Sequence, residues 1–147
     1  MLQATQSPVL PGIRAIEAEM VALRHRIHSH PELGFEEFVT SDLVAECLQA
    51  WGYAVHRGLG GTGVLGTLRN GEGRALGLRA DMDALPIQEA TGLPYASKLD
   101  GKMHACGHDG HTATLLAAAR YPGRAQALQG HAAPDLPARR GRHGRRP

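Results

Sequence analysis

Residues 75–86 read ALGLRADMDALP, an apolar segment that runs into two aspartates and then a proline. A short apolar run between glycine-rich turns predicts a β-strand. Asp81 and Asp83 are two positions apart, so both lie on the same side if the strand extends that far. Acidic groups just beyond an apolar strand are typical of ligand sites in α/β folds, and the alternative is a cap on the turn before Pro86. The spacing alone favours neither explanation.

The segments upstream of this strand predict two helices. Apolar residues three and four positions apart predict a first helix that begins near Pro11 and ends before Pro31. A second helix is predicted from residue 40 or 41, whose hydroxyl group caps it, to Trp51. Gly52 is a good stop signal for that helix. Cys47 lies on its apolar face and is interpreted as a small core residue.

Strands follow these helices, and a third helix is predicted at residues 111–120, with Asp109 or Thr112 as its cap. Glycine-rich turns separate the strand-like segments YAVHRG, GTGVLGTL and RALGLRADMD. This order predicts one α/β domain whose sheet is covered on at least one face. No apolar run approaches the roughly 20 residues of a membrane span, and the first residues lack the pattern of a secretory signal. Two cysteines cannot form a disulfide scaffold, so we expect a cytoplasmic protein.

A second stretch, MHACGHDGH at residues 103–111, gathers residue types that ligate metal ions. Cys106 and His108 are two positions apart, and Gly107 between them allows a tight bend that presents both side chains to one point. A thiolate and an imidazole suit Zn²⁺ or a similar divalent ion. No second Cys/His pair follows at zinc-finger spacing, so a metal site here would be of the open, catalytic type. The alternative is a polar turn ahead of a helix.

A third stretch, HRIHSHPELGFEE at residues 25–37, contains three histidines and three glutamates. These side chains are potential ligands as well. Spacing alone favours a different interpretation, a helix end that carries surface charges.

Three blocks of this chain together resemble a known enzyme group. They are HSHPELGFEEFVTSDLVAECLQAWGY, GLGGTGVLGTL and LRADMDALPIQEATGLPYASKLDGKMHACGHDGHTATLLAAAR, within residues 13–121. The blocks are similar to the N-terminal part of the metal-dependent N-acyl-amino-acid amidohydrolases, which include hippurate hydrolases and indole-acetyl-amino-acid hydrolases, within the aminoacylase and carboxypeptidase superfamily. The resemblance implies an incomplete zinc-peptidase-like α/β domain at residues 1–121, with a mixed sheet flanked by helices.

The resemblance also implies roles at matching positions. Asp83 matches the catalytic aspartate that orients a metal ligand. Cys106 and His108 match metal ligands, with Cys106 as the bridge between two divalent ions of zinc, manganese, cobalt or nickel. The implied reaction is hydrolysis of an N-acyl amino acid by a metal-bound water, in a homo-oligomer. His104 and His111 are expected to shape the loop and the helix start, and the role of Asp81 stays open.

The resemblance stops at Tyr121, and residues 122–147 form a basic tail. This tail lacks the general base that the family carries in a Pro-Ala-Glu-Glu block, and it lacks the further metal ligands. One set of codons that can encode Gly130–Arg140 encodes a strand followed by Gln-Pro-Ala-Glu when it is read in the frame that starts at the second nucleotide. We therefore expect that a frameshift produced the tail, that the tail is disordered, and that this truncated chain is inactive alone.

Two alternative functions belong to other classes. One is a non-catalytic metal-binding or interaction protein that reuses this part of the fold. The other is nucleic-acid binding, because six arginines face one acidic residue between Arg124 and the end. The tail has no aromatic residues and no helical periodicity, so we expect neither nucleic acid nor membrane as a partner. The expected partner is a small N-acyl amino acid, and the sequence does not fix its acyl group or its amino acid.

Overall fold

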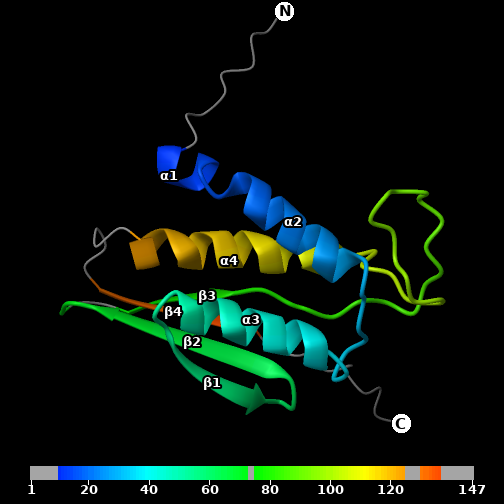
Figure 1. The fold of residues 1–147 in the computed structure, drawn as a ribbon. Coiled ribbons are helices and arrows are strands. Elements are labelled where there is room, and N and C mark those ends of the chain that lie inside the picture. The colour runs from blue at the N-terminus through cyan, green and yellow to red at the C-terminus, as the bar shows by residue number, and fades with distance from the viewer. Residues whose placement is uncertain (1–9, 73–74, 125–129, 137–147) are drawn as a thin grey trace, which may run out of the picture.

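The computed structural model describes residues 10–72, 75–124 and 130–136 (Figure 1). The helices are α1 (Pro11–Arg14), α2 (Glu17–His28), α3 (Phe38–Ala50) and α4 (His108–Arg124). The strands are β1 (Ala54–Leu59), β2 (Gly63–Asn70), β3 (Ala75–Arg79) and β4 (Gly130–Leu136). In the described part of the chain, no helix combines the length and the apolar character that crossing a membrane requires.

The four strands form one mixed sheet in the order β1-β2-β4-β3. β2 is antiparallel to both β1 and β4, whereas β3 is parallel to β4. Gly60 and Gly61 turn the chain from β1 into β2 with φ angles of 62° and 104°, which favour glycine. β3 lies at the edge of the sheet, where Leu76 and Leu78 are exposed. The mixed sheet with helices confirms the predicted fold class.

One apolar core joins the sheet to three helices. Figure 1 shows α4 lying along the sheet, with α2 on the other side of α4. The core contains residues of α2, α3, α4 and β2, together with residues just before α2, just before β1 and just after β3: Ile16, Met20, Val44, Ala45, Leu48, Tyr53, Val64, Ala80, Met82, Leu115, Leu116 and Ala119. The apolar stripe predicted for the first helix therefore faces this core, although a break at Ala15 and Ile16 divides that helix into α1 and α2. Cys47 is half-buried and packs against the core, as predicted.

The start of α3 differs from the prediction. α3 begins at Phe38, and its first amides are capped by Glu32 from the preceding turn. The Glu32 carboxylate accepts hydrogen bonds from the amides of Val39 at 3.0 Å and Thr40 at 2.8 Å, and from the Thr40 hydroxyl at 2.8 Å. The expected hydroxyl cap at residue 40 or 41 was wrong, because the chain folds back and brings a carboxylate to the helix N-terminus. Gly52, with φ 87°, follows the helix end as predicted.

The segment after Tyr121 also differs from the prediction in part. α4 begins at His108, ahead of the predicted start, and extends to Arg124. Residues 130–136 form β4 between β2 and β3, where the expectation was a disordered tail. The expectation of disorder considered side-chain burial, whereas backbone pairing holds this segment between β2 and β3, although Pro134 within it has no amide hydrogen to donate. The rest of the predicted tail, residues 125–129 and 137–147, lies outside the described residues.

Candidate functional site

The two ligand-like motifs meet where the chain leaves β3 and approaches α4. The strand ends at Arg79, so it does not extend to either aspartate. Leu85 and Met103 then pair in an antiparallel bridge, with N···O distances of 2.9 and 3.0 Å. The residues between them, 86–102, therefore form a loop that starts and ends at the same place; we call it the intermotif loop. This bridge brings the neighbourhood of Asp83 next to the residues that precede His108.

Asp83 and His108 are in direct contact. The Nδ1 atom of His108 lies 2.9 Å from the backbone oxygen of Asp83 and 3.0 Å from its carboxylate Oδ1. Both of these atoms are acceptors, so Nδ1 donates the hydrogen, and in the neutral ring this tautomer leaves on Nε2 the lone pair that a metal ion needs. The His108 side chain is 19% exposed, while that of Asp83 is buried. This is the arrangement by which a carboxylate orients a metal-ligating histidine.

Cys106 precedes His108 on a tight turn. Gly107 has a φ of 79°, and its amide donates to the carbonyl of His104 at 3.2 Å. The bend predicted at this glycine is therefore present. Cys106 is an exposed free thiol, so its sulfur is accessible to an ion from the solvent.

Asp81 and His111 lie at the border of this arrangement. Asp81 forms an ion pair with Arg79 at 3.1 Å, and its backbone oxygen accepts the hydroxyl of Thr112 at 3.1 Å. The exposed ring of His111 lies 5.6 Å, centroid to centroid, from that of His108. The two aspartates of the motif thus have different partners, and only Asp83 contacts His108.

His104 is buried beneath this turn. Its relative exposure is 3%, and neither ring nitrogen has a hydrogen-bond partner in the described part of the chain. Burial lowers the pKa of His104 to about 4, against an opposing effect of the Asp109 carboxylate. The ring is therefore neutral at neutral pH.

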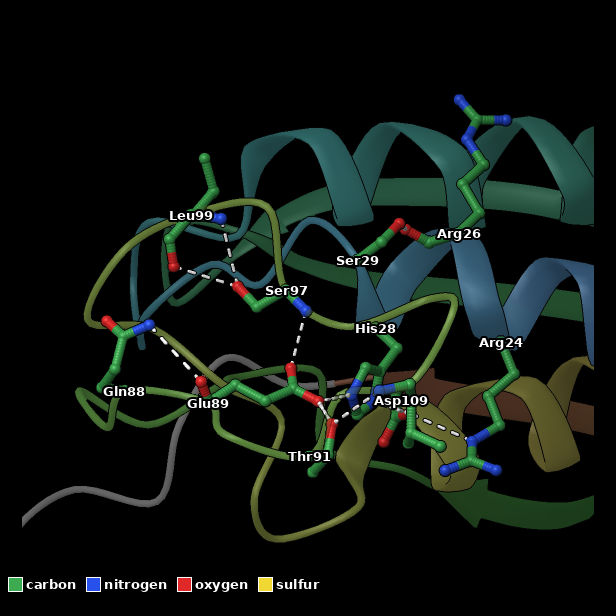
Figure 2. Close-up of polar contacts among 11 residues, drawn as sticks. Arg24, Arg26, His28, Ser29, Gln88, Glu89, Thr91, Ser97, Leu99 and Asp109 are labelled. Atoms are coloured by element: carbon green, nitrogen blue, oxygen red, sulfur yellow. Dashed lines mark hydrogen bonds and ion pairs between the residues drawn. The ribbon is translucent and has the colours of Figure 1, made fainter.

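A buried chain of charged side chains lies beside the candidate ligands, and Figure 2 shows its members. His28 at the end of α2 places Nδ1 at 2.8 Å from Asp109 Oδ2 and Nε2 at 3.2 Å from Glu89 Oε1. Arg24 donates to the same Asp109 oxygen at 3.0 Å. Although burial raises the pKa of Asp109, hydrogen bonds from His28, the Gly110 amide and Arg24 lower it below its ordinary value.

The interpretation of residues 25–37 as surface charges was wrong for two of them. His28 is buried between two carboxylates. Glu37 is buried as well, and its carboxylate accepts the hydroxyl of Thr62 at 2.6 Å. Sequence reasoning also missed Glu89, which stands alone in its segment and offers no pattern, and it treated Asp109 only as a possible helix cap. The position of Asp109 inside the MHACGHDGH stretch was the available signal.

The chemistry of the donors fits a divalent ion, but the set is small. Cys106 offers sulfur and His108 offers Nε2, which suit zinc and neighbouring transition metals. In residues 10–72, 75–124 and 130–136, no three side chains of His, Cys, Asp or Glu are arranged to hold a metal ion. The two candidate donors at this turn are fewer than the three or four protein ligands typical of zinc sites.

The chain is similar to hydrolases from several organisms. The family model described as peptidase family M20/M25/M40 matches residues 77–131. A hippurate hydrolase of Campylobacter jejuni is 54% identical over 114 residues, which are 77% of this chain and 30% of that enzyme. An N-acetyl-L-cysteine deacetylase of Bacillus subtilis is 46% identical over 119 residues, which are 80% of this chain and 28% of that enzyme.

A solved structure supports the same relationship. The YXEP protein of Bacillus subtilis, described as a dinuclear metal-binding peptidase of the M20 family, is 37% identical with a TM-score of 0.78. The match covers 84% of this chain and 35% of that one. This chain thus spans about a third of the length of the relatives it matches.

Proposed function

Since the chain belongs to the M20/M25/M40 peptidase family, a family of hydrolytic enzymes, we propose that it carries part of the active site of an amidohydrolase. The proposed reaction is hydrolysis of the amide bond of an N-acyl amino acid at a centre of two divalent ions. The observation that carries the proposal is the contact between His108 and Asp83, next to an exposed thiol at Cys106. Hippurate and N-acetyl-amino-acid substrates are the first to test, because similar proteins are named for them.

We assign one role to each of these three residues. Cys106 and His108 hold the ions, and Asp83 is the catalytic aspartate that fixes the ring of His108. Zinc, manganese, cobalt and nickel all accept this type of donor set. A bound divalent ion supplies Lewis acidity, which polarises the amide carbonyl and lowers the pKa of water to about 7. The protein side of the site keeps Nε2 of His108 free and directed by the hydrogen bonds of Nδ1.

We propose that the general base and the other metal ligands are encoded in a second reading frame of the gene. Gly130–Arg140 are compatible with codons that encode a strand and Gln-Pro-Ala-Glu in the second frame, as expected for this family. We propose that residues 1–121 are the N-terminal part of the catalytic domain and that residues 122–147 arise from a shifted frame. The complete protein is then a cytoplasmic homo-oligomer, and the chain of 147 residues is inactive.

Two measurements test this proposal. The nucleotide sequence across codons 119–147 should encode Gln-Pro-Ala-Glu in the second frame, and its absence there contradicts the frameshift. A protein expressed from the restored frame should release glycine from hippurate or acetate from N-acetyl amino acids after loading with manganese, cobalt, nickel or zinc. Cys106→Ser and His108→Ala in that protein should remove the activity, whereas Cys47→Ser should keep it. Retained activity in the first two variants contradicts the assigned roles.

A second candidate function is favoured by one observation. β4 lies between β2 and β3, so residues after the family-like part complete the sheet of this chain. This arrangement suits a non-catalytic metal-binding protein that reuses the fold. A chain of 147 residues that binds one equivalent of Co²⁺ without hydrolysing hippurate supports this candidate if the second frame of its gene does not encode Gln-Pro-Ala-Glu. Activity of the protein expressed from the restored frame favours the amidohydrolase, whether or not the chain of 147 residues binds Co²⁺.

A further inference from the structure

Three acidic and basic side chains from three separate segments meet below the protein surface (Figure 2). Glu89 belongs to the intermotif loop, His28 to the end of α2 and Asp109 to the first turn of α4. Their side chains are 2%, 6% and 0% exposed, respectively. The contacts join residues that are 61 and 81 positions apart in the sequence. We call this set the Glu89–His28–Asp109 chain.

The charges of the three side chains in the Glu89–His28–Asp109 chain depend on one another. A neutral imidazole donates one hydrogen bond, whereas both ring nitrogens of His28 face carboxylate oxygens. A carboxylate only accepts, so both contacts are hydrogen bonds at the same time only when each ring nitrogen carries a hydrogen. Arg24 supplies a cation at Asp109. Removal of one member leaves a buried charge without its partner, so the neighbours are expected to move.

At one end, Glu89 holds the intermotif loop. Its second oxygen accepts the amide of Ser97 at 2.6 Å, and its first accepts the hydroxyl of Thr91. The amide of Lys98 donates to the carbonyl of Ser29 at 3.0 Å. Tyr95 stacks on His25 with 3.7 Å between ring centroids. Burial raises the pKa of Glu89, but its hydrogen bonds lower it below the ordinary value, so the carboxylate stays charged. The loop is thus fixed to the end of α2.

At the other end, Asp109 fixes the turn that carries the candidate ligands. Asp109 follows His108 directly, and its carboxylate accepts the amide of Gly110. The amides of Gly110 and His111 donate to the carbonyl of Gly107 at 3.0 and 3.1 Å, which closes the first turn of α4. His108 itself faces away toward Asp83. The Glu89–His28–Asp109 chain therefore contacts the ligand turn without touching the ligands.

We propose that Glu89, His28 and Asp109 are positioning residues, which transmit the conformation of the intermotif loop to the turn that carries Cys106 and His108. The inference rests on the proposed function for the identity of the ligands. It assigns Glu89, which contacts neither ligand, an effect on ion binding through His28. Outer partners of metal ligands typically change metal affinity by at least about tenfold, and we expect Glu89→Gln to weaken Co²⁺ binding by about tenfold.

The experiment uses the full chain with Co²⁺ as the probe. Binding is followed by the thiolate-to-cobalt absorption, which Cys106→Ser should remove. Glu89→Gln is compared with the matched control Glu46→Gln, at an exposed glutamate of α3 that lies outside the intermotif loop and the ligand turn. The Glu89→Gln change is then made in a His28→Gln background. We expect weaker binding from Glu89→Gln in the native background, no further loss in the His28→Gln background, and no change from Glu46→Gln. Equal losses in both backgrounds mean independent effects and overturn the proposal.

A second measurement does not need the metal. Amide hydrogen exchange at Gly110 and His111 should be faster in Glu89→Gln than in Glu46→Gln, because the first turn of α4 loses its anchor. Unchanged exchange at these amides overturns the positioning role. If Glu89→Gln does not fold, Thr91→Val should give the same change with a smaller size, because it removes the hydroxyl that donates to Glu89 and accepts the exposed amide of Leu93. Absence of the cobalt absorption in the unchanged chain contradicts the proposed ligands, while the exchange result still decides the positioning role.

Discussion

Acidification is expected to destabilise the metal-free chain through His104. The pKa of this buried ring is lowered to about 4 from 6.5, chiefly by burial, so the unfolded chain binds the extra proton more readily than the folded chain. The folded state is thus fully favoured above pH 6.5 and loses this contribution as the pH falls toward 4. The difference of about 2.5 pKa units corresponds to about 3 kcal/mol of unfolding free energy.

The surroundings of His104 explain why its proton is disfavoured. The carboxylates of Asp109 and Asp83 favour the charged ring, whereas His28 and His108 disfavour it. Neither ring nitrogen has a partner in the described part of the chain, so no hydrogen bond compensates for the loss of water. Desolvation exceeds the attraction of the two carboxylates, and this balance gives the sign of the prediction.

The assay is urea denaturation at fixed pH values between 7 and 4, with a chelator present. The unchanged chain should lose about 3 kcal/mol more over this interval than the variant His104→Gln, whose side chain does not titrate. His56→Gln is the matched control, since His56 is exposed on β1, and it should keep the full pH dependence. Parallel loss of stability in the unchanged chain and in His104→Gln would refute the reasoning.

Three further predictions concern the cap, the core and the thiols. Glu32→Ala should lower the unfolding free energy by about 1–2 kcal/mol in urea denaturation, because three donors at the start of α3 lose their acceptor. The control Glu36→Ala should change the unfolding free energy little, and equal effects of the two substitutions contradict the cap. Leu48→Ala, at a fully buried position, should cost about 3 kcal/mol in the same assay, and a loss below about 1 kcal/mol contradicts its place in the core. Iodoacetamide should label exposed Cys106 faster than Cys47, whose pKa is raised by burial and by nearby glutamates, and Cys106→Ser should leave only the slow reaction.

The parts of the fold that follow from local patterns were predictable. The spacing of Met20 and Ile27 gave the buried face of the first helix, and Gly52 marked the end of α3. The cap from Glu32 was not predictable, since it depends on a turn that brings a distant carboxylate to the helix start. The position of β4 was not predictable either, because backbone pairing with β2 and β3 determines it rather than a side-chain pattern.

The candidate site divides in the same way. Asp83, Cys106 and His108 were selected from the sequence through the resemblance of their motifs to a known family, whereas spacing alone left Asp81, His104 and His111 as alternatives. The contact between Asp83 and His108 adds what the motifs do not contain, the direction of the ring and the free nitrogen. Glu89 has no motif, and its importance depends on a histidine 61 positions earlier. Sequence motifs therefore identify the groups that lie inside them, including the orienting Asp83, and they miss Glu89, whose contact with His28 is distant in the sequence.

The order of the motifs explains why a positioning element is needed at all. Asp83 lies before the intermotif loop and His108 lies after it, so the distance between them depends on how the loop closes. The backbone bridge of Leu85 and Met103 closes the loop base with two hydrogen bonds, each worth about 1 kcal/mol. A bridge of two hydrogen bonds opens at a small cost in free energy. Opening the buried ionic chain costs more, because its members cannot separate without leaving charges unpaired. The Glu89–His28–Asp109 chain supplies this second constraint, so the loop and the ligand turn are expected to open together rather than separately.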